Sequence, residues 1–186
     1  MRKLIMWNII TLDAYFEGNA PWELPFHELV WGPELKRRSI EQLEAADYLL
    51  FGRATYEGMA AHWTTAEGKI AELMNSIPKL VASRTLNSVD WNNSILIKGD
   101  LAAEIRKLKE EGGKDIYLFG SAKLAESLLA DDLFDEYRIG IAPVILGQGR
   151  PLFSQNVNRR ELKLVESQTL SNGGMVLTYH NNPLSP

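Results

Sequence analysis

The stretch Phe51-Gly52-Arg53-Ala54-Thr55-Tyr56-Glu57 follows a short apolar run, Tyr48–Phe51, and precedes a segment with helical character. This order predicts a turn from a buried strand into a helix, and such a turn exposes backbone N–H groups that attract phosphate. Gly52 permits a close approach of the backbone, Thr55 offers a hydroxyl and Arg53 offers a forked cation. Taken alone, the stretch fits a solvated turn with a helix cap equally well.

Two further turns repeat this chemistry after other predicted strands: Ala82-Ser83-Arg84-Thr85 and Phe119-Gly120-Ser121-Ala122. The carboxyl ends of neighbouring parallel strands lie side by side, and ligands of open α/β sheets bind beyond those ends. The first two turns would therefore place Arg53, Ser83 and Arg84 around one anion. The small residues of the third turn would let a pyrophosphate approach the helix that follows. An arginine in a surface turn and a plain helix cap are the structural alternatives.

Short apolar runs alternate with segments of helical period along most of the chain. The predicted strands are Lys3–Leu12, Tyr48–Phe51, Lys79–Ala82, Ser94–Lys98, Asp115–Phe119, Tyr137–Leu146, Leu162–Leu170 and Met175–His180. Helical periodicity occupies Leu35–Ala46, Ala66–Ile77, a segment that Asp100 can cap and Gly112-Gly113 can stop, and a segment that Ser121 can cap. This alternation predicts parallel strands with crossover helices, and therefore an α/β fold built as a three-layer αβα sandwich.

The pattern changes after Asp135, where three predicted strands follow one another without helices. Ser171-Asn172-Gly173-Gly174 separates the last two and is typical of a hairpin. The sheet should therefore be mixed, mostly parallel, with antiparallel strands at its C-terminal end. Pro143 cannot donate a ladder hydrogen bond, so its strand should lie at an edge or break there. Without repeats or linkers, residues 1–186 are expected to form a single domain.

Composition excludes several classes of function. The 186 residues include no cysteine, which excludes disulfides, thiolate nucleophiles and zinc–thiolate sites. The formal net charge of −4 argues against a nucleic-acid partner. The apolar run near the N-terminus is short and contains Asn8, so it indicates a buried strand rather than a signal peptide, and no segment is apolar over the roughly 18 residues of a membrane span. We therefore expect a cytoplasmic protein. The spacing of the three histidines predicts no metal site.

Two loops could contact a substrate. The proline-framed loop Asn19–Leu29 carries Trp22, which could line a cleft for a flat heterocycle, and His27 and Glu28, which could handle a proton. Core aromatics with surface charges are the alternative interpretation. In the second loop, Gly147-Gln148-Gly149-Arg150 could hold a substrate phosphate through its backbone amides and its arginine. A β-bulge or a dimer-contact loop explains that segment equally well.

Five motifs in this order resemble the dihydrofolate reductase superfamily, and more closely its riboflavin-pathway reductase branch, the C-terminal domain of RibD-type proteins. They are Thr11-Leu12-Asp13-Ala14, Gly52-Arg53-x-Thr55-Tyr56-Glu57, Ser83-Arg84, Gly120-Ser121-Ala122 and Pro143-x-x-Leu146-Gly147-x-Gly149-x-x-Leu152-Phe153. The resemblance covers nearly the whole chain. It implies an eight- to nine-stranded mixed sheet, NADPH as the hydride donor and a homodimer.

The resemblance also assigns residues to the cofactor. It places Arg53, in the turn that Gly52 opens, at the adenosine 2′-phosphate together with Ser83 and Arg84 of the second turn. It places Thr55 at the pyrophosphate, together with the turn Gly120, Ser121 and Ala122. The first strand, around Trp7 and Asn8, would border the nicotinamide.

One departure concerns the acid of the folate reductases. Pro21-Trp22-Glu23-Leu24-Pro25 resembles their P-W-x-L-P loop, yet the position of their carboxylate is His27 here. Glu28 is adjacent but would point about 100° away on a helix. Asp13, His27 and Glu28 are thus the candidate catalytic, proton-handling residues, and the displaced acid weakens a folate assignment.

These residues lead to three functional hypotheses. The first is an NADPH-dependent reductase of a pyrimidine or pterin-like heterocycle, most like 5-amino-6-(5-phosphoribosylamino)uracil reductase of riboflavin biosynthesis. In that enzyme the cofactor supplies the chemistry and the protein supplies position and electrostatics. The second is a dihydrofolate reductase with a relocated acid. The third is a non-catalytic protein of the same fold that binds a nucleotide or heterocycle.

Overall fold

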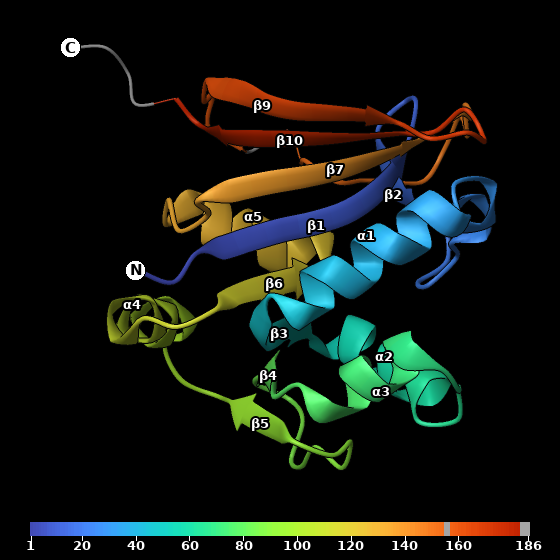
Figure 1. Ribbon diagram of the computed structural model, residues 1–186. Coiled ribbons are helices and arrows are strands. Elements are labelled where there is room, and N and C mark those ends of the chain that lie inside the picture. The colour runs from blue at the N-terminus through green and yellow to red at the C-terminus, as the bar shows by residue number, and fades with distance from the viewer. Residues whose placement is uncertain (155–156, 183–186) are drawn as a thin grey trace.

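An eight-stranded sheet runs through the computed structural model, which describes residues 1–154 and 157–182 (Figure 1). Its strands are β1 (Leu4–Thr11), β3 (Ala46–Gly52), β4 (Lys79–Ala82), β5 (Ser94–Ile97), β6 (Asp115–Phe119), β7 (Glu136–Ala142), β9 (Leu162–Thr169) and β10 (Met175–Asn181). Their order across the sheet is β5-β4-β3-β6-β1-β7-β10-β9. Neighbours from β5 to β7 run parallel, whereas β10 pairs antiparallel with β7 and with β9. The mixed, mostly parallel sheet predicted from the sequence is therefore confirmed.

Helices cover both faces of this sheet and make it the middle of three layers (Figure 1). They are α1 (Pro33–Glu44), α2 (Arg53–Trp63), α3 (Lys69–Ser76), α4 (Leu101–Glu111), α5 (Ala122–Ala130) and the 3₁₀ helix η1 (Pro25–Leu29). Side chains of a strand alternate between faces. On β1, Leu4 and Met6 join the apolar cluster under α4 and α5, while Ile5 and Trp7 join the cluster under α1 and α3. One buried strand thus serves two cores, which explains its continuous apolar sequence.

The helix and hairpin signals of the sequence correspond to real local structure. Asp100 caps α4 by accepting a hydrogen bond from the Ala103 N–H at 3.1 Å, and Gly112 ends that helix with a φ of 74°. Ser121 caps α5 through the Leu124 N–H at 3.2 Å. The turn at 171–174 joins β9 and β10 into the expected antiparallel hairpin. Each signal acts within a few residues, so it can be recognised in the sequence without knowledge of tertiary contacts.

The apolar run Tyr137–Leu146 is a shorter strand than predicted. Strand β7 ends at Ala142, directly before Pro143, and it lies between β1 and β10 rather than at an edge. The proline therefore breaks the strand. Beyond it, β8 (Arg150–Pro151) pairs with β2 (Tyr15–Glu17) in a separate two-stranded sheet that the sequence did not indicate.

Within residues 1–154 and 157–182, no helix combines the length and the apolar character that crossing a membrane requires.

Arg2 fastens the amino-terminal end of the sheet. Its guanidinium donates to Asp47 Oδ2 at 2.8 Å, to the Leu108 carbonyl at 2.9 Å and to the Lys114 carbonyl at 2.7 Å. The guanidinium also lies 5.1 Å from the ring centre of Tyr48. Arg2 is only 6% exposed, so these partners would lose their donor without gaining full access to water.

We expect Arg2→Met to lower the free energy of unfolding by about 2–3 kcal/mol, because buried acceptors lose a charged donor. The measurement is urea unfolding followed by circular dichroism. Arg37→Met is the matched control, since Arg37 is exposed and its contact with Glu41 is 3.9 Å long. The control should change stability by less than about 0.5 kcal/mol. Equal losses in the two variants would contradict the anchoring role of Arg2.

Candidate functional site

Three strand-to-helix turns meet at one edge of the sheet. Strand β3 lies between β4 and β6, so the turns after these three strands are neighbours. Residues of all three turns line one open groove with a volume of about 870 Å³. Those named from the sequence are Gly52, Arg53, Ser83, Arg84 and Ser121. The parallel register thus places side by side residues that are about 30 positions apart in the chain.

Two helices begin in this groove. Helix α2 starts at Arg53 behind Gly52, and no side chain caps its first N–H groups. Helix α5 starts behind Ser121, whose φ is 64°. A Cβ on Gly52 would lie 2.6 Å from Ser121 Oγ, so only glycine lets the two turns approach this closely. Paired helix N-termini with open backbone donors form an environment that favours phosphate.

The groove also collects cationic side chains. Arg53 donates to Glu57 Oε1 at 2.9 Å and to Thr85 Oγ1 at 3.1 Å, and it stays half-exposed. Arg84 is exposed. Lys98 and Lys123 line the same groove and were not named from the sequence. The available signal for Lys98 is its place at the carboxyl end of a predicted strand, much as Arg53 lies just beyond one.

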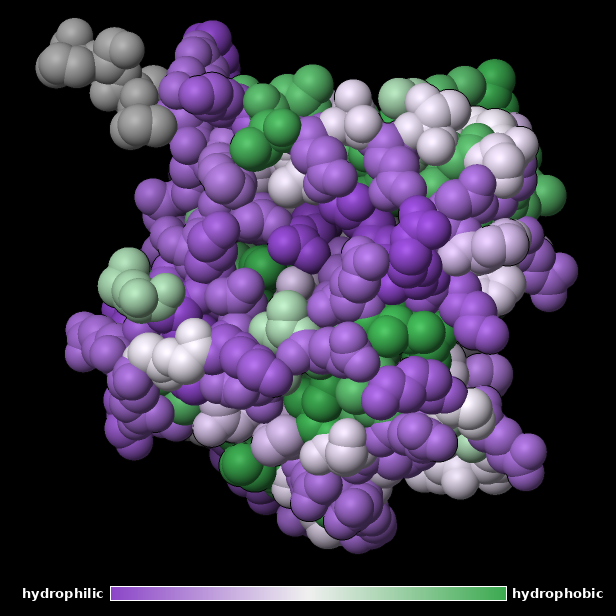
Figure 2. Space-filling model, in the orientation of Figure 1, coloured by the Kyte–Doolittle hydropathy of each residue, from purple (hydrophilic) through white to green (hydrophobic). Residues whose placement is uncertain are grey.

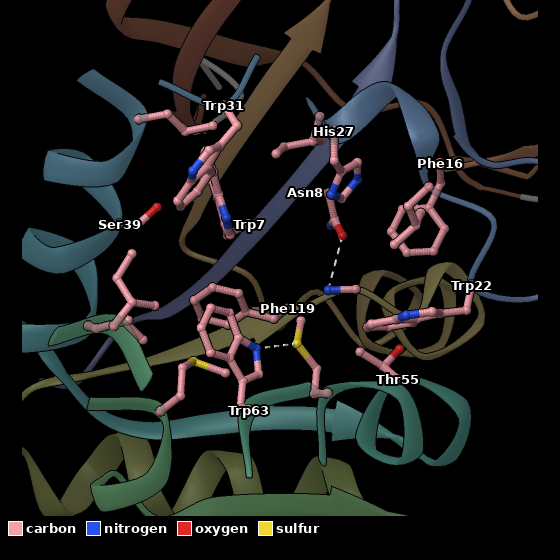
Figure 3. Close-up of a pocket in the computed structure, with 18 residues that line it drawn as sticks. Trp7, Asn8, Phe16, Trp22, His27, Trp31, Ser39, Thr55, Trp63 and Phe119 are labelled. Atoms are coloured by element: carbon pink, nitrogen blue, oxygen red, sulfur yellow. Dashed lines mark hydrogen bonds between the residues drawn. The ribbon is translucent and has the colours of Figure 1, made fainter. Parts of the chain in front are cut away.

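A second cavity, of about 170 Å³, adjoins the groove and is aromatic. Four of the chain's five tryptophans line it, together with two phenylalanines: Trp7, Trp22, Trp31, Trp63, Phe16 and Phe119 (Figure 3). Trp22 and Trp31 are 42% and 51% exposed. Figure 2 shows apolar side chains at the surface between α1 and the α2–α3 pair, on a face that is otherwise mostly hydrophilic. In the described part of the chain, no lysine, arginine, aspartate or glutamate lines this cavity.

Asn8 and His27 provide polar atoms in this apolar cavity (Figure 3). Asn8 Oδ1 accepts a hydrogen bond from the Gly120 N–H at 3.1 Å, while its Nδ2 is buried without a partner. His27 Nε2 is likewise buried and unpaired. Burial lowers the pKa of His27 from 6.5 to about 4, so the ring is neutral at pH 7. Gly120 and Thr55 also line this cavity. In the chain they lie one and two positions from Ser121 and Arg53, which line the groove.

The other two candidate proton-handling residues lie outside the cavity. Glu28 is exposed on η1. Asp13 accepts hydrogen bonds from Thr11 Oγ1 at 2.6 Å, from the Leu146 N–H at 3.1 Å and from the Gly147 N–H at 2.8 Å. These bonds, the one from Thr11 foremost, lower the pKa of Asp13 to about 2. Asp13 is therefore an ionised anchor for the loop after β7 and not a proton donor in the cavity.

The loop expected to hold a substrate phosphate lies apart from both spaces. Gly147, Gly149 and Arg150 line neither the groove nor the aromatic cavity. Arg150 forms an ion pair with Glu17 at 3.1 Å, and Glu17 also accepts a hydrogen bond from the Trp22 N–H. A Cβ on Gly149 would lie 2.4 Å from the Glu17 carbonyl oxygen. The loop thus packs β8 against β2 and supports Trp22, which does line the cavity.

Several residues that line the cavity come from helices and were not predicted from the sequence. They are Ser39 of α1, Met59 and Trp63 of α2, and Ile70 and Met74 of α3. Their apolar helical spacing is that of any core-facing helix, so periodicity alone could not separate cavity wall from core. Ala122, expected beside a pyrophosphate, is buried as the first residue of α5 and lines neither space.

Comparison with known proteins places this architecture in a family. The model of the RibD C-terminal domain matches residues 2–176. The chain belongs to the RibD C-terminal domain family. The uncharacterized protein YyaP of Bacillus subtilis is 33% identical over 189 residues, which cover 97% of this chain and 96% of YyaP. Resemblance to this family was the expectation from the sequence, and it is confirmed.

Solved structures share the fold of this RibD C-terminal domain. A Shewanella sp. PV-4 protein assigned to riboflavin biosynthesis superposes with a TM-score of 0.80 at 24% identity, covering 97% of this chain and 99% of that one. Acinetobacter baumannii RibD gives a TM-score of 0.72 at 14% identity, with coverage of 98% and 58%. Dihydrofolate reductase from Enterococcus faecalis, complexed with NADP(H), gives 0.62 at 14% identity, with coverage of 97% and 96%. At these identities the likeness shows the common fold.

The buried neutral state of His27 predicts a pH dependence of stability. In the unfolded chain the ring has its ordinary pKa of 6.5, whereas in the folded chain the pKa is about 4. As the pH falls through this window, the unfolded chain binds the proton first, so the folded state loses stability. Relative to His27→Phe, the wild-type protein should lose up to about 3 kcal/mol of unfolding free energy between pH 6.5 and pH 4.

Urea unfolding at several pH values within that window measures this effect. His62→Phe is the control, because His62 is an exposed histidine that also packs edge-on against an aromatic neighbour, Trp63. The unfolding free energy of the His62→Phe variant should change with pH as that of the wild-type protein does. If the difference in unfolding free energy between the wild type and His27→Phe stays constant across the window, His27 is not held neutral.

Proposed function

We propose that this chain is an NADPH-dependent reductase that transfers a hydride to a pyrimidine or pterin-like heterocycle. The observation that carries the proposal is the junction at Gly120. Its N–H is held by Asn8 in the aromatic cavity, and the next residue, Ser121, lines the cationic groove. A dinucleotide in the groove would therefore reach a flat substrate in the cavity. The reductase fold of the family supports the same assignment.

The residues of the groove fit NADPH. Arg53, Ser83 and Arg84 would face the 2′-phosphate, where two guanidinium groups give charge-assisted hydrogen bonds. Thr55 and the turn at Gly120-Ser121 would hold the pyrophosphate near the start of α5. A Cβ on Gly120 would lie 3.1 Å from Thr55 Cγ2, so the glycine keeps this passage open. When bound, NADPH supplies the hydride.

The protein contributes position and exclusion of water. The tryptophans of the cavity cover the faces of a planar ring, and Asn8 Nδ2 and His27 Nε2 fix its orientation by hydrogen bonds. The substrate carbon gains the hydride and the adjacent atom gains a proton. That proton comes from water, because His27 is neutral and no carboxylate lines the cavity in the described residues.

A folate substrate is less well supported than a pyrimidine. Glu28, the carboxylate nearest to the expected position, is exposed and outside the cavity. Steady-state oxidation of NADPH with dihydrofolate and with 5-amino-6-(5-phosphoribosylamino)uracil or its dephosphorylated riboside tests the proposal. Turnover of a pyrimidine supports it. Turnover of dihydrofolate that Glu28→Gln abolishes would support a folate reductase instead, and NADPH binding without any turnover would support a binding protein.

Replacing both Arg53 and Arg84 with alanine should weaken NADPH binding much more than NADH binding. Each arginine is expected to contribute about 1.5–3 kcal/mol to holding the 2′-phosphate. Isothermal titration calorimetry with both cofactors measures the difference. Arg106→Ala is the control, since Arg106 is exposed on α4 and lines neither space. Equal losses for NADPH and NADH would mean that these arginines do not recognise that phosphate.

A further inference from the structure

Two unpaired polar atoms mark the aromatic cavity as a recognition site. Asn8 is 3% exposed, and its Oδ1 is used by the Gly120 N–H, which leaves Nδ2 without a partner. His27 Nε2 is buried beside an apolar wall and also lacks a partner. Buried polar groups are normally paired, and one left unpaired costs free energy. Both atoms belong to residues that line one cavity, so a single ligand could satisfy both.

The chemistry of these two atoms defines the ligand. Asn8 Nδ2 can only donate a hydrogen bond. The neutral His27 ring accepts at Nε2 when its proton is on Nδ1. The ligand must therefore offer an acceptor to Asn8 and a donor to His27, and a cyclic amide carries both, as its carbonyl and its N–H. The tryptophan walls require the rest of the ligand to be flat.

The charges of the side chains around the cavity narrow the chemical class of the ligand further. No cationic side chain lines the cavity among the described residues, so a phosphate or carboxylate placed there would lose its hydration without compensation. Arg150 is already paired with Glu17. Arg53 and Arg84 lie in the groove that we assign to the cofactor. These three arginines are thus committed elsewhere.

We propose that the substrate is an uncharged, unphosphorylated planar heterocycle whose cyclic amide accepts from Asn8 Nδ2 and donates to His27 Nε2. The proposal rests on the proposed reductase function in calling this ligand a substrate. It narrows that function, because it separates this chain from reductases whose substrates carry a sugar phosphate or, like folate, carboxylates.

Two pterins of similar size, one neutral and one anionic, test the proposal. 6-Hydroxymethylpterin is uncharged, whereas 6-carboxypterin is an anion, and both carry the same cyclic amide. Quenching of tryptophan fluorescence in the cofactor-free protein reports binding, because four tryptophans line the cavity. We expect 6-hydroxymethylpterin to bind at least tenfold more tightly. Equal or tighter binding of 6-carboxypterin, or no binding of either compound, would overturn the proposal.

Variants test whether Asn8 Nδ2 and His27 Nε2 form hydrogen bonds with the ligand. Asn8→Asp keeps the acceptor for the Gly120 N–H and replaces the free donor with an acceptor, so binding of 6-hydroxymethylpterin should fall at least tenfold. His27→Phe should cause a similar loss, whereas His27→Gln, which retains an acceptor, should restore part of it. His62→Phe should bind as the wild type does. Circular dichroism shows whether each variant is folded. Unchanged binding by folded Asn8→Asp and His27→Phe would refute the assignment.

Separate titration with NADPH keeps this proposal distinct from the proposed function. If 6-hydroxymethylpterin binds as expected and NADPH does not bind, the reductase function fails and the cavity assignment stands. If NADPH binds and 6-carboxypterin is preferred in the cavity, the reductase function stands and the substrate class is wrong.

Discussion

A single hydrogen bond joins the two halves of the candidate site. The Gly120 N–H donates to Asn8 Oδ1 at 3.1 Å, between the turn after β6 and the neighbouring strand β1. It occupies the carboxamide oxygen of Asn8, a residue that lines the aromatic cavity, and leaves the buried Nδ2 without a partner. It also fixes the backbone directly before Ser121, which caps α5 in the groove. Cavity and groove therefore owe their relative position to the parallel pairing of adjacent strands.

The site divides its chemistry by charge. Cationic side chains and open helix N-termini lie in the groove, while the adjoining cavity is aromatic and, in the described residues, uncharged. A protein with a net charge of −4 has little general attraction for anions, so the local arrangement decides what binds. Lys98 and Lys123 extend the cationic character that Arg53 and Arg84 begin. This division suits a phosphorylated cofactor beside a neutral, flat partner.

Much of the fold was predictable because its signals are local. The cap at Asp100, the hairpin turn at 171–174 and the glycine turn at Gly52 act within a few residues. The contacts of the loop after β7 could not be predicted, for the opposite reason. Arg150 resembles a phosphate ligand in sequence, but its partner Glu17 is supplied by β2, more than 130 positions earlier. The same holds for Asp13, because Leu146 and Gly147, which donate to its oxygens, lie across the fold.

The sequence by itself determined the succession of helices and main-sheet strands, the three turns at one sheet edge and the resemblance to RibD-type reductases. These follow from periodicity and from short motifs, which a single chain displays without folding. Only the tertiary structure decided that Nε2 of His27 is buried and the ring neutral, that Glu28 is exposed and that Asn8 keeps a free donor. Burial and pairing depend on side chains from α1, α2, α3 and β6 together, and no local pattern specifies which of them will meet.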